Sequence, residues 1–190
     1  MSLVRRGIYA HEVRIIGGQW KRSKLPVLDR PGLRPTPDRV RETLFNWLGQ
    51  DLTGWRVLDA FAGSGALGFE AASRGAAEVV LLERDAALVR NLSDVKARLK
   101  ADAVQVQAAD ALAWLARCVP QRFELLLLDP PFDAGLFEAA LAAAAPAVAD
   151  GGHIYLEAGR EFDAAPAGFT CQRHLRAGAV HAHLFSRSDG

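Results

Sequence analysis

Short apolar runs alternate along this chain with segments whose apolar residues recur at helical spacing. The run at 56–60 breaks into small residues and continues as a helical pattern over 67–72 that ends at Gly75. A strand, a glycine turn and a helix form the first unit of a doubly wound α/β sheet, in which ligands bind just beyond the carboxyl ends of the strands. The later apolar runs predict strands at 77–83, 104–108, 123–128, 153–157, 169–175 and 180–185.

The order of these elements predicts the fold class. Strands separated by helical segments favour parallel pairing, whereas the last two runs flank Gly178 and indicate an antiparallel hairpin. We therefore expect a Rossmann-like α/β fold with a mostly parallel seven-stranded sheet and helices on both faces.

The N-terminal residues predict a small additional element. Val13–Ile16 followed by two glycines indicates a strand and a tight turn, with Trp20–Val27 as the returning strand. We expect residues 1–30 to form a basic arm with a β-hairpin and residues 31–190 to form the main domain. The first helix of that domain is predicted to have Thr36 as its N-cap and Pro37 as its first residue.

Composition limits the class of protein. The chain has 190 residues, half of them apolar, which suits one compact domain with a small extension. It contains no apolar run of membrane-spanning length and no apolar stretch near the start that is typical of a secretory signal. Cys118 and Cys171 are isolated, and neither they nor the histidines show metal-ligand spacing. We expect a cytoplasmic monomer with no disulfide, metal ion or membrane anchor.

The net charge of +1 conceals an asymmetry. Residues 1–41 contain ten Lys or Arg and three acids, a balance of +7, whereas the rest contains thirteen against nineteen, a balance of −6. A basic arm on an acidic body suggests a polyanionic partner, although a solvated leader is the alternative. Cations with an aromatic residue among them suit phosphate contacts and base stacking. The candidate RNA-binding residues are Arg14, Trp20, Lys21, Arg22 and Lys24. For Trp20, packing on the body is the alternative.

The glycine turn after the first strand of the sheet is the first candidate ligand site. Gly63–Gly68 matches the dinucleotide pattern G-x-G-x-x-G, and Glu83 follows about twenty residues on, as that pattern requires. However, Asp59 directly precedes the turn, and its carboxylate would repel a diphosphate but attract a cation. S-adenosyl-L-methionine carries an ammonium and a sulfonium and no phosphate, so we prefer it to a nicotinamide cofactor. The alternative is that the glycines only make a tight turn.

Two further acids stand at the carboxyl ends of predicted strands. Glu83 could accept hydrogen bonds from both hydroxyls of a ribose, or it could be a solvated strand end. Asp110 could accept from an adenine amino group, or it could cap the helix that begins at Ala111.

The most continuous apolar strand, 123–128, ends in Asp129-Pro130-Pro131-Phe132. Two prolines stiffen this loop and remove two N–H donors, which leaves the Asp129 carboxylate and the Pro130 carbonyl as acceptors. A pair of acceptors suits an –NH2 group, and Phe132 offers a flat face for the attached base. An ordinary proline turn is the alternative.

With both loops described, the chain resembles the class I S-adenosylmethionine-dependent methyltransferases. More narrowly, it is similar to the bacterial 16S rRNA (guanine(966)-N(2))-methyltransferases. The C-terminal hairpin departs from that family, because His181, Ala182 and His183 stand where a tyrosine-containing sequence is expected. The segments that carry the resemblance are Arg14–Trp20, Gly32–Thr36, Asp38–Leu48, Phe61–Gly68 and Asp129–Phe132.

The resemblance implies roles for these residues. Asp129 and Pro130 would hold the guanine amino group, with Phe132 stacked on the ring, and the partner would be 16S rRNA in the 30S subunit or an assembly intermediate. After methyl transfer, the cofactor would be left as S-adenosyl-L-homocysteine. The implied cofactor-binding residues are Thr36, Asp59, Ala60, Phe61, Gly63, Gly65, Glu83, Arg84, Asp110 and Ala111.

Three other functions fit parts of the sequence. The same tetrapeptide could hold any aromatic amine, so the chain could methylate adenine N6 in nucleic acid, and methylation of a protein amide is a variant of that activity. A non-catalytic RNA-binding or ribosome assembly factor on the same fold is the third, because fold alone does not establish function.

Overall fold

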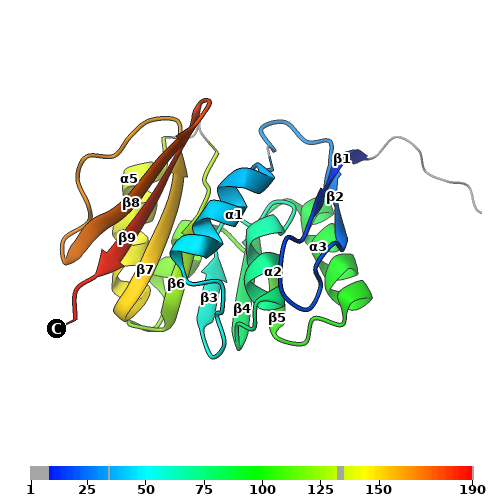
Figure 1. Cartoon of the computed structure of the whole chain (residues 1–190), viewed down its shortest axis with the longest axis horizontal. Helices are drawn as coiled ribbons and strands as arrows, with labels where there is room; N and C mark the ends of the chain where they lie inside the picture. Colours follow the sequence, from blue (N-terminus) through cyan, green and yellow to red (C-terminus); the bar gives the residue numbers. More distant parts are fainter. Residues whose placement is uncertain (1–8, 34, 132–134, 190) are drawn as a thin grey trace, which may run out of the picture.

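The computed structural model describes residues 9–33, 35–131 and 135–189 (Figure 1). Its main sheet has seven strands in the order β5-β4-β3-β6-β7-β9-β8. The pairs of β7 with β9 and of β8 with β9 are antiparallel, and the other pairs are parallel, so the predicted mostly parallel sheet is confirmed. The strands are β3 (Arg56–Asp59), β4 (Glu78–Glu83), β5 (Val104–Ala108), β6 (Phe123–Leu128), β7 (Val148–Ala158), β8 (Phe169–Ala177) and β9 (Val180–Arg187).

Helices cover both faces of this sheet, as predicted. Alternate residues of each central strand face opposite sides, so that Val57 belongs to one buried cluster and Leu58 to the other. The first cluster also contains residues of α1 (Asp38–Trp47), α2 (Ala66–Ser73) and α3 (Ala86–Leu99). The second contains residues of α4 (Ala111–Ala116), α5 (Phe137–Ala144) and the 3₁₀ turn η2 (Ala145–Ala147).

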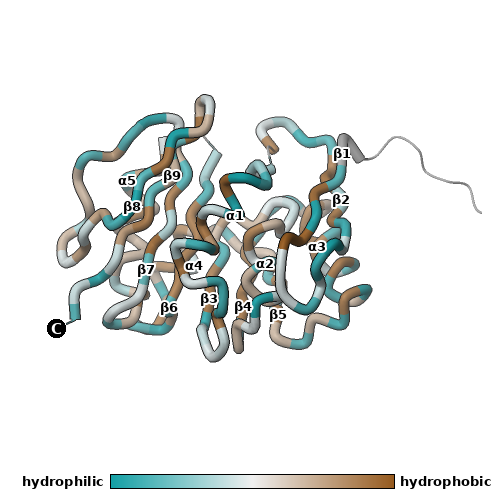
Figure 2. Tube along the Cα trace, viewed as in Figure 1, coloured by the Kyte–Doolittle hydropathy of each residue, from teal (hydrophilic) through white to brown (hydrophobic). Residues whose placement is uncertain are grey.

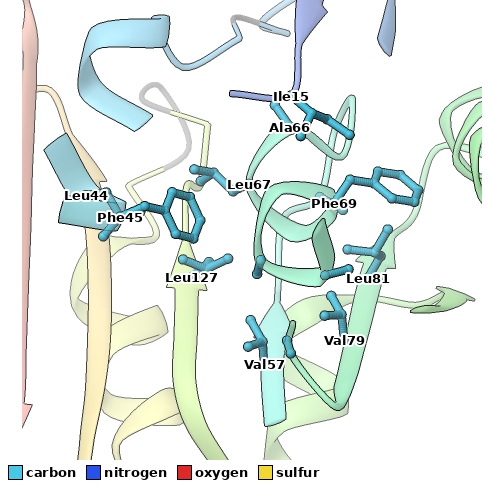
Figure 3. Close-up of a cluster of buried hydrophobic side chains, with 14 of the residues drawn as sticks. Ile15, Leu44, Phe45, Val57, Ala66, Leu67, Phe69, Val79, Leu81 and Leu127 are labelled. Carbon is cyan, nitrogen blue, oxygen red and sulfur yellow. The ribbon is translucent and has the colours of Figure 1, made fainter. Parts of the chain in front are cut away.

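Figure 3 shows part of the first cluster, in which side chains from α1 and α2 pack toward the strands below them. Phe45 and Phe69 are fully buried there. The hydrophobic stretches of the chain follow the strands of the sheet, while most connecting loops are hydrophilic (Figure 2). Burial on both faces explains why the central strands are continuous apolar runs in the sequence.

The N-terminal residues form a two-stranded antiparallel hairpin of β1 (Tyr9–Arg14) and β2 (Lys24–Leu28). The prediction of a tight turn at Gly17 and Gly18 and of a returning strand from Trp20 was wrong, because residues 16–21 form a loop and β2 begins only at Lys24. Glu70 and Ser73 of α2 are the physical reason. The Glu70 carboxylate accepts from Ile16 N at 2.8 Å and Gly17 N at 2.9 Å, and Ser73 Oγ accepts from Trp20 N at 3.0 Å. Within the described residues, cross-strand bonds continue only as far as Ile15, which donates to Ser23 O at 2.9 Å and accepts from Arg22 N at 2.8 Å, and beyond it the bonds to the helix take their place.

The interior of the molecule also contains a charged cluster. Arg41 is fully buried, and its guanidinium donates to the carbonyl of Arg14 at 2.9 Å and contacts Glu70 at 3.5 Å and Asp38. Arg74 donates to Glu70 at 2.9 Å. Arg41 thus joins α1, α2 and the hairpin. Among the described residues, no helix is long and apolar enough to cross a membrane.

Candidate active site

A cavity of about 650 Å³ opens at the carboxyl ends of β3, β4, β5 and β6, where the doubly wound topology predicts a ligand site. It brings together eleven of the predicted site residues. Phe132 lies outside the described residues, and Gly65 is not among the residues that line the cavity. The predicted residues that line it are Thr36, Asp59, Ala60, Phe61, Gly63, Glu83, Arg84, Asp110, Ala111, Asp129 and Pro130.

Asp59 ends β3 at the wall of the cavity and is only 1% exposed. Its Oδ2 accepts from Gly68 N, in the first turn of α2, at 3.0 Å. Its Oδ1 has no hydrogen-bond partner in the part of the chain that the structure describes. Burial raises the pKa of Asp59 to about 7. A buried acceptor without a partner favours a cationic ligand group and disfavours a phosphate at this helix N-terminus.

The glycine turn is shaped by its neighbours. Gly63 has φ +56° and donates its N–H to Glu83 Oε2 at 3.1 Å. Gly65 has φ +83°, and a Cβ there would lie 2.5 Å from the ring of Phe69 and 2.8 Å from Leu92. Gly65 is therefore required for the packing of the turn against the core.

Glu83 is held at the end of β4 by backbone groups. Besides the bond from Gly63 N, its Oε1 accepts from Arg84 N and Asp85 N at 3.0 Å each. These three bonds fix the carboxylate at the wall of the cavity, while the Arg84 side chain is exposed at its edge. Asp110 is the N-cap of α4, since its Oδ1 accepts from Ala113 N at 3.0 Å, and it also lines the cavity.

The most concentrated group of acids surrounds Asp129, which directly follows β6. Its carboxyl is hydrogen-bonded to that of Glu157, at the end of β7, and burial together with the charges of Glu157 and Asp59 raises its pKa well above the ordinary range. Glu157 also accepts from Tyr155 Oη at 2.7 Å and from the Thr36 hydroxyl.

The prediction that Thr36 caps α1 was wrong. The N-cap is Pro37, whose ψ of 146° is extended, so the helix begins one residue later than predicted, and no side chain in the described part of the chain caps it. The Thr36 hydroxyl donates to Glu157.

Glu157 was missed by the sequence reasoning. It lines the cavity and is 3% exposed. A signal was available, because Glu157 ends the apolar run 153–157 as Asp59 and Glu83 end theirs.

The hairpin presents all four of its predicted RNA-binding cations to solvent. Arg14, Lys21, Arg22 and Lys24 are exposed, and Lys24 Nζ lies 3.6 Å from Glu12. Trp20 is half-buried and packs against the core.

The comparisons with known proteins identify the family. The family model described as Conserved hypothetical protein 95 matches residues 13–186. The chain belongs to this family of class I methyltransferases. "Ribosomal RNA small subunit methyltransferase D" of Escherichia coli (strain K12) is 44% identical over 93% of this chain and 90% of its own length. The protein of the same name from Haemophilus influenzae is 46% identical over 68% of this chain and 69% of its own length.

Two solved structures are also similar to this chain. The putative methyltransferase yhhF from Escherichia coli has a TM-score of 0.84 and 42% identity, and the match covers 95% of this chain and all of that one. The putative methylase HI0767 from Haemophilus influenzae has a TM-score of 0.80 and 35% identity, over 94% of this chain and all of that one. The fold is thus that of these structural neighbours, which are methyltransferases.

Proposed function

We propose that this protein transfers a methyl group from S-adenosyl-L-methionine to the exocyclic N2 of a guanine in 16S rRNA. The observation that carries the proposal is a single cavity that contains an acid suited to a cation, Asp59, and a pair of acceptors suited to an amine, Asp129 and Pro130. The names of the relatives, which are small-subunit ribosomal RNA methyltransferases, support the RNA substrate. Such a protein would act in the cytoplasm, where ribosomes assemble, and we expect it to act as a monomer.

The residues of the cavity fit this cofactor. Asp59 has a buried oxygen that would accept from the methionine ammonium and that has no partner within residues 9–33, 35–131 and 135–189. Glu83, held at the wall of the cavity by backbone groups, would accept from the ribose hydroxyls. Asp110 and Ala111, which also line the cavity, would contact the adenine. When bound, the cofactor would supply an activated methyl group on its sulfonium. The remaining predicted contacts with the cofactor would come from Thr36, Ala60, Phe61, Gly63 and Arg84.

Asp129 and Pro130 would bind and orient the amine. The lone pair of guanine N2 is delocalised into the ring, so the nitrogen is a poor nucleophile. Hydrogen bonds from its two N–H groups to the Asp129 carboxyl and the Pro130 carbonyl favour pyramidalisation and turn the lone pair toward the donor. Positive charge that develops on the nitrogen is stabilised by the nearby carboxyl groups. Phe132 remains the predicted stacking partner of the base.

The basic hairpin would contact the RNA backbone. Arg14, Lys21, Arg22 and Lys24 are suited to phosphate contacts, which position a nucleic acid without reading its sequence. Because base pairing hides the guanine amino group, the target should be unpaired or flipped out of its stack. Trp20 would support the hairpin by packing, with a base-stacking role as the alternative.

The test is the variant Asp129→Ala, assayed for methyl transfer and, separately, for binding of S-adenosyl-L-methionine by calorimetry. We expect turnover to fall by about two orders of magnitude or more, the usual cost of losing a group that stabilises charge in the transition state. Cofactor affinity should stay within a few-fold of wild type. An equal loss of turnover and cofactor affinity would contradict the role given to Asp129.

Methylation of adenine N6 is the second candidate, because the acceptor pair at Asp129 and Pro130 would bind any aromatic amine. Nucleoside analysis of RNA labelled by the enzyme separates N2-methylguanosine from N6-methyladenosine. A protein that bound RNA but no S-adenosyl-L-methionine would instead be a non-catalytic assembly factor.

A further inference from the structure

Glu157 is a buried acid that the proposed mechanism has not yet used. It stands near the end of β7, beside the acceptor pair, and it lines the same cavity. Two hydroxyl groups bind it, from Tyr155 at 2.7 Å and from Thr36. Its third partner is the carboxyl of Asp129, because Asp129 and Glu157 directly follow Leu128 and Leu156, which are paired in the parallel register of β6 and β7. A hydrogen bond between two carboxyl groups requires that one of them carries a proton.

The charges around the pair decide how that proton is held. On the α1 side, Arg41 stabilises the charge of Glu157. From β3, the Asp59 carboxyl opposes ionisation of Asp129. Tyr155 stays protonated, because burial and Glu157 raise its pKa well above the ordinary value.

The net result is an asymmetric pair. Burial raises the pKa of both carboxyl groups, but their mutual hydrogen bond raises that of Asp129 and lowers that of Glu157. The two groups therefore titrate as a pair that holds one shared proton and carries a single negative charge.

We propose that Glu157 is a positioning residue that shares one proton with Asp129, so that Asp129 turns one oxygen to Glu157 and keeps the other as the acceptor for the substrate amine. This inference rests on the proposed function for the identity of that amine. Glu157, held by the hydroxyls of Tyr155 in β7 and of Thr36 before α1, thus fixes the orientation of Asp129 after β6.

The pair also receives the surplus proton. After N2 has gained its methyl group, an N–H bond at N2 breaks and an O–H bond forms on the pair, which then holds two protons and no charge. The pair returns to one proton by releasing the other to water. No other reactant is required.

Two substitutions separate this role from simple packing. Glu157→Gln keeps the size of the side chain and an oxygen for the Tyr155 and Thr36 hydroxyls, but it cannot share a proton. Glu157→Ala removes all three contacts. Thermal unfolding of both variants shows whether they fold.

The first measurement needs neither RNA nor cofactor. Carbon-13 NMR of labelled side-chain carboxyl groups, titrated with pH, should show Asp129 and Glu157 titrating together in two steps in the wild type. In Glu157→Gln, Asp129 should titrate in one step at a lower pKa, because the neighbouring negative charge is gone. An Asp129 titration that is the same in both proteins would overturn the inference.

The second measurement is the pH profile of methyl transfer. We expect Glu157→Ala to lose about a hundredfold in turnover, the scale of a misplaced catalytic group. Glu157→Gln should turn over only about tenfold more slowly than wild type. Its pH profile should report one ionisation in place of the coupled ionisations of the pair. Wild-type turnover in Glu157→Ala, or an unchanged pH profile in Glu157→Gln, would contradict the role. A wild-type protein without methyl transfer would refute the proposed function instead, and the NMR titration would still decide whether the proton is shared.

Discussion

The substitution Asp59→Asn should make the ligand-free protein more stable and the cofactor site weaker. Asparagine has nearly the same shape, and its oxygen can accept from Gly68 N as the Asp59 Oδ2 does now at 3.0 Å. What disappears is a negative charge that is 1% exposed and has an oxygen without a partner among the described residues.

The magnitude follows from the raised pKa of Asp59. One pKa unit corresponds to about 1.36 kcal/mol, so a carboxyl whose pKa rises from 3.8 to about 7 on folding costs about 4 kcal/mol of unfolding free energy at pH 8. Because the pKa is raised, this cost is absent below pH 4, grows as the pH rises toward 7 and is constant above it. At pH 5 it is about 1.5 kcal/mol.

Urea unfolding of the ligand-free proteins at pH 5 and pH 8 measures this effect. The stability advantage of Asp59→Asn over wild type should increase between these two pH values by about 2–3 kcal/mol. Calorimetry should show at least a tenfold loss of affinity for S-adenosyl-L-methionine. Asp51→Asn is the control: Asp51 is exposed and hydrogen bonds from Thr53 lower its pKa, so its loss should give no gain at pH 8. An Asp59→Asn variant that is less stable than wild type at pH 8, or whose advantage does not change with pH, would refute the reasoning.

Two further predictions concern the hairpin and its attachment. Glu70→Ala leaves the buried Arg41 guanidinium without its fully buried partner. We expect the free energy of unfolding, measured by urea unfolding, to fall by about 3–5 kcal/mol. A loss below about 1 kcal/mol would show that this network contributes little. The double substitution Lys21→Glu/Arg22→Glu should weaken RNA binding in filter or fluorescence assays, most strongly at low salt, because it reverses two exposed cations. Arg117→Glu, at an exposed position after α4, is its matched control, and equal losses in both proteins would argue against a specific role for the hairpin.

The sheet and three of the acids could be predicted because they depend on local pattern. Central strands of a doubly wound sheet are buried on both faces, so they stand out as apolar runs, and an acid that ends such a run lies at the ligand edge. Asp59, Glu83 and Asp129 are found in this way, and all three line one cavity.

The features that were not predicted depend on partners distant in the sequence. Thr36 has the residue type and position of an N-cap, but Pro37 is extended and the helix begins only at Asp38, while the Thr36 hydroxyl donates to the distant Glu157. The loop after β1 is kept open by Glu70, more than fifty residues away. Arg41 is buried because that same acid and backbone carbonyls receive its guanidinium. No local pattern reports such long-range pairings.

A crystal structure of the protein with S-adenosyl-L-homocysteine tests the central claim most directly, because that claim is a spatial one. We predict the methionine amino group within about 3 Å of Asp59 Oδ1, the ribose hydroxyls on Glu83, and the sulfur atom facing the side of the cavity formed by Asp129 and Pro130. A ligand bound in the reverse orientation, with its adenine at Asp59, or bound outside this cavity, would contradict the account.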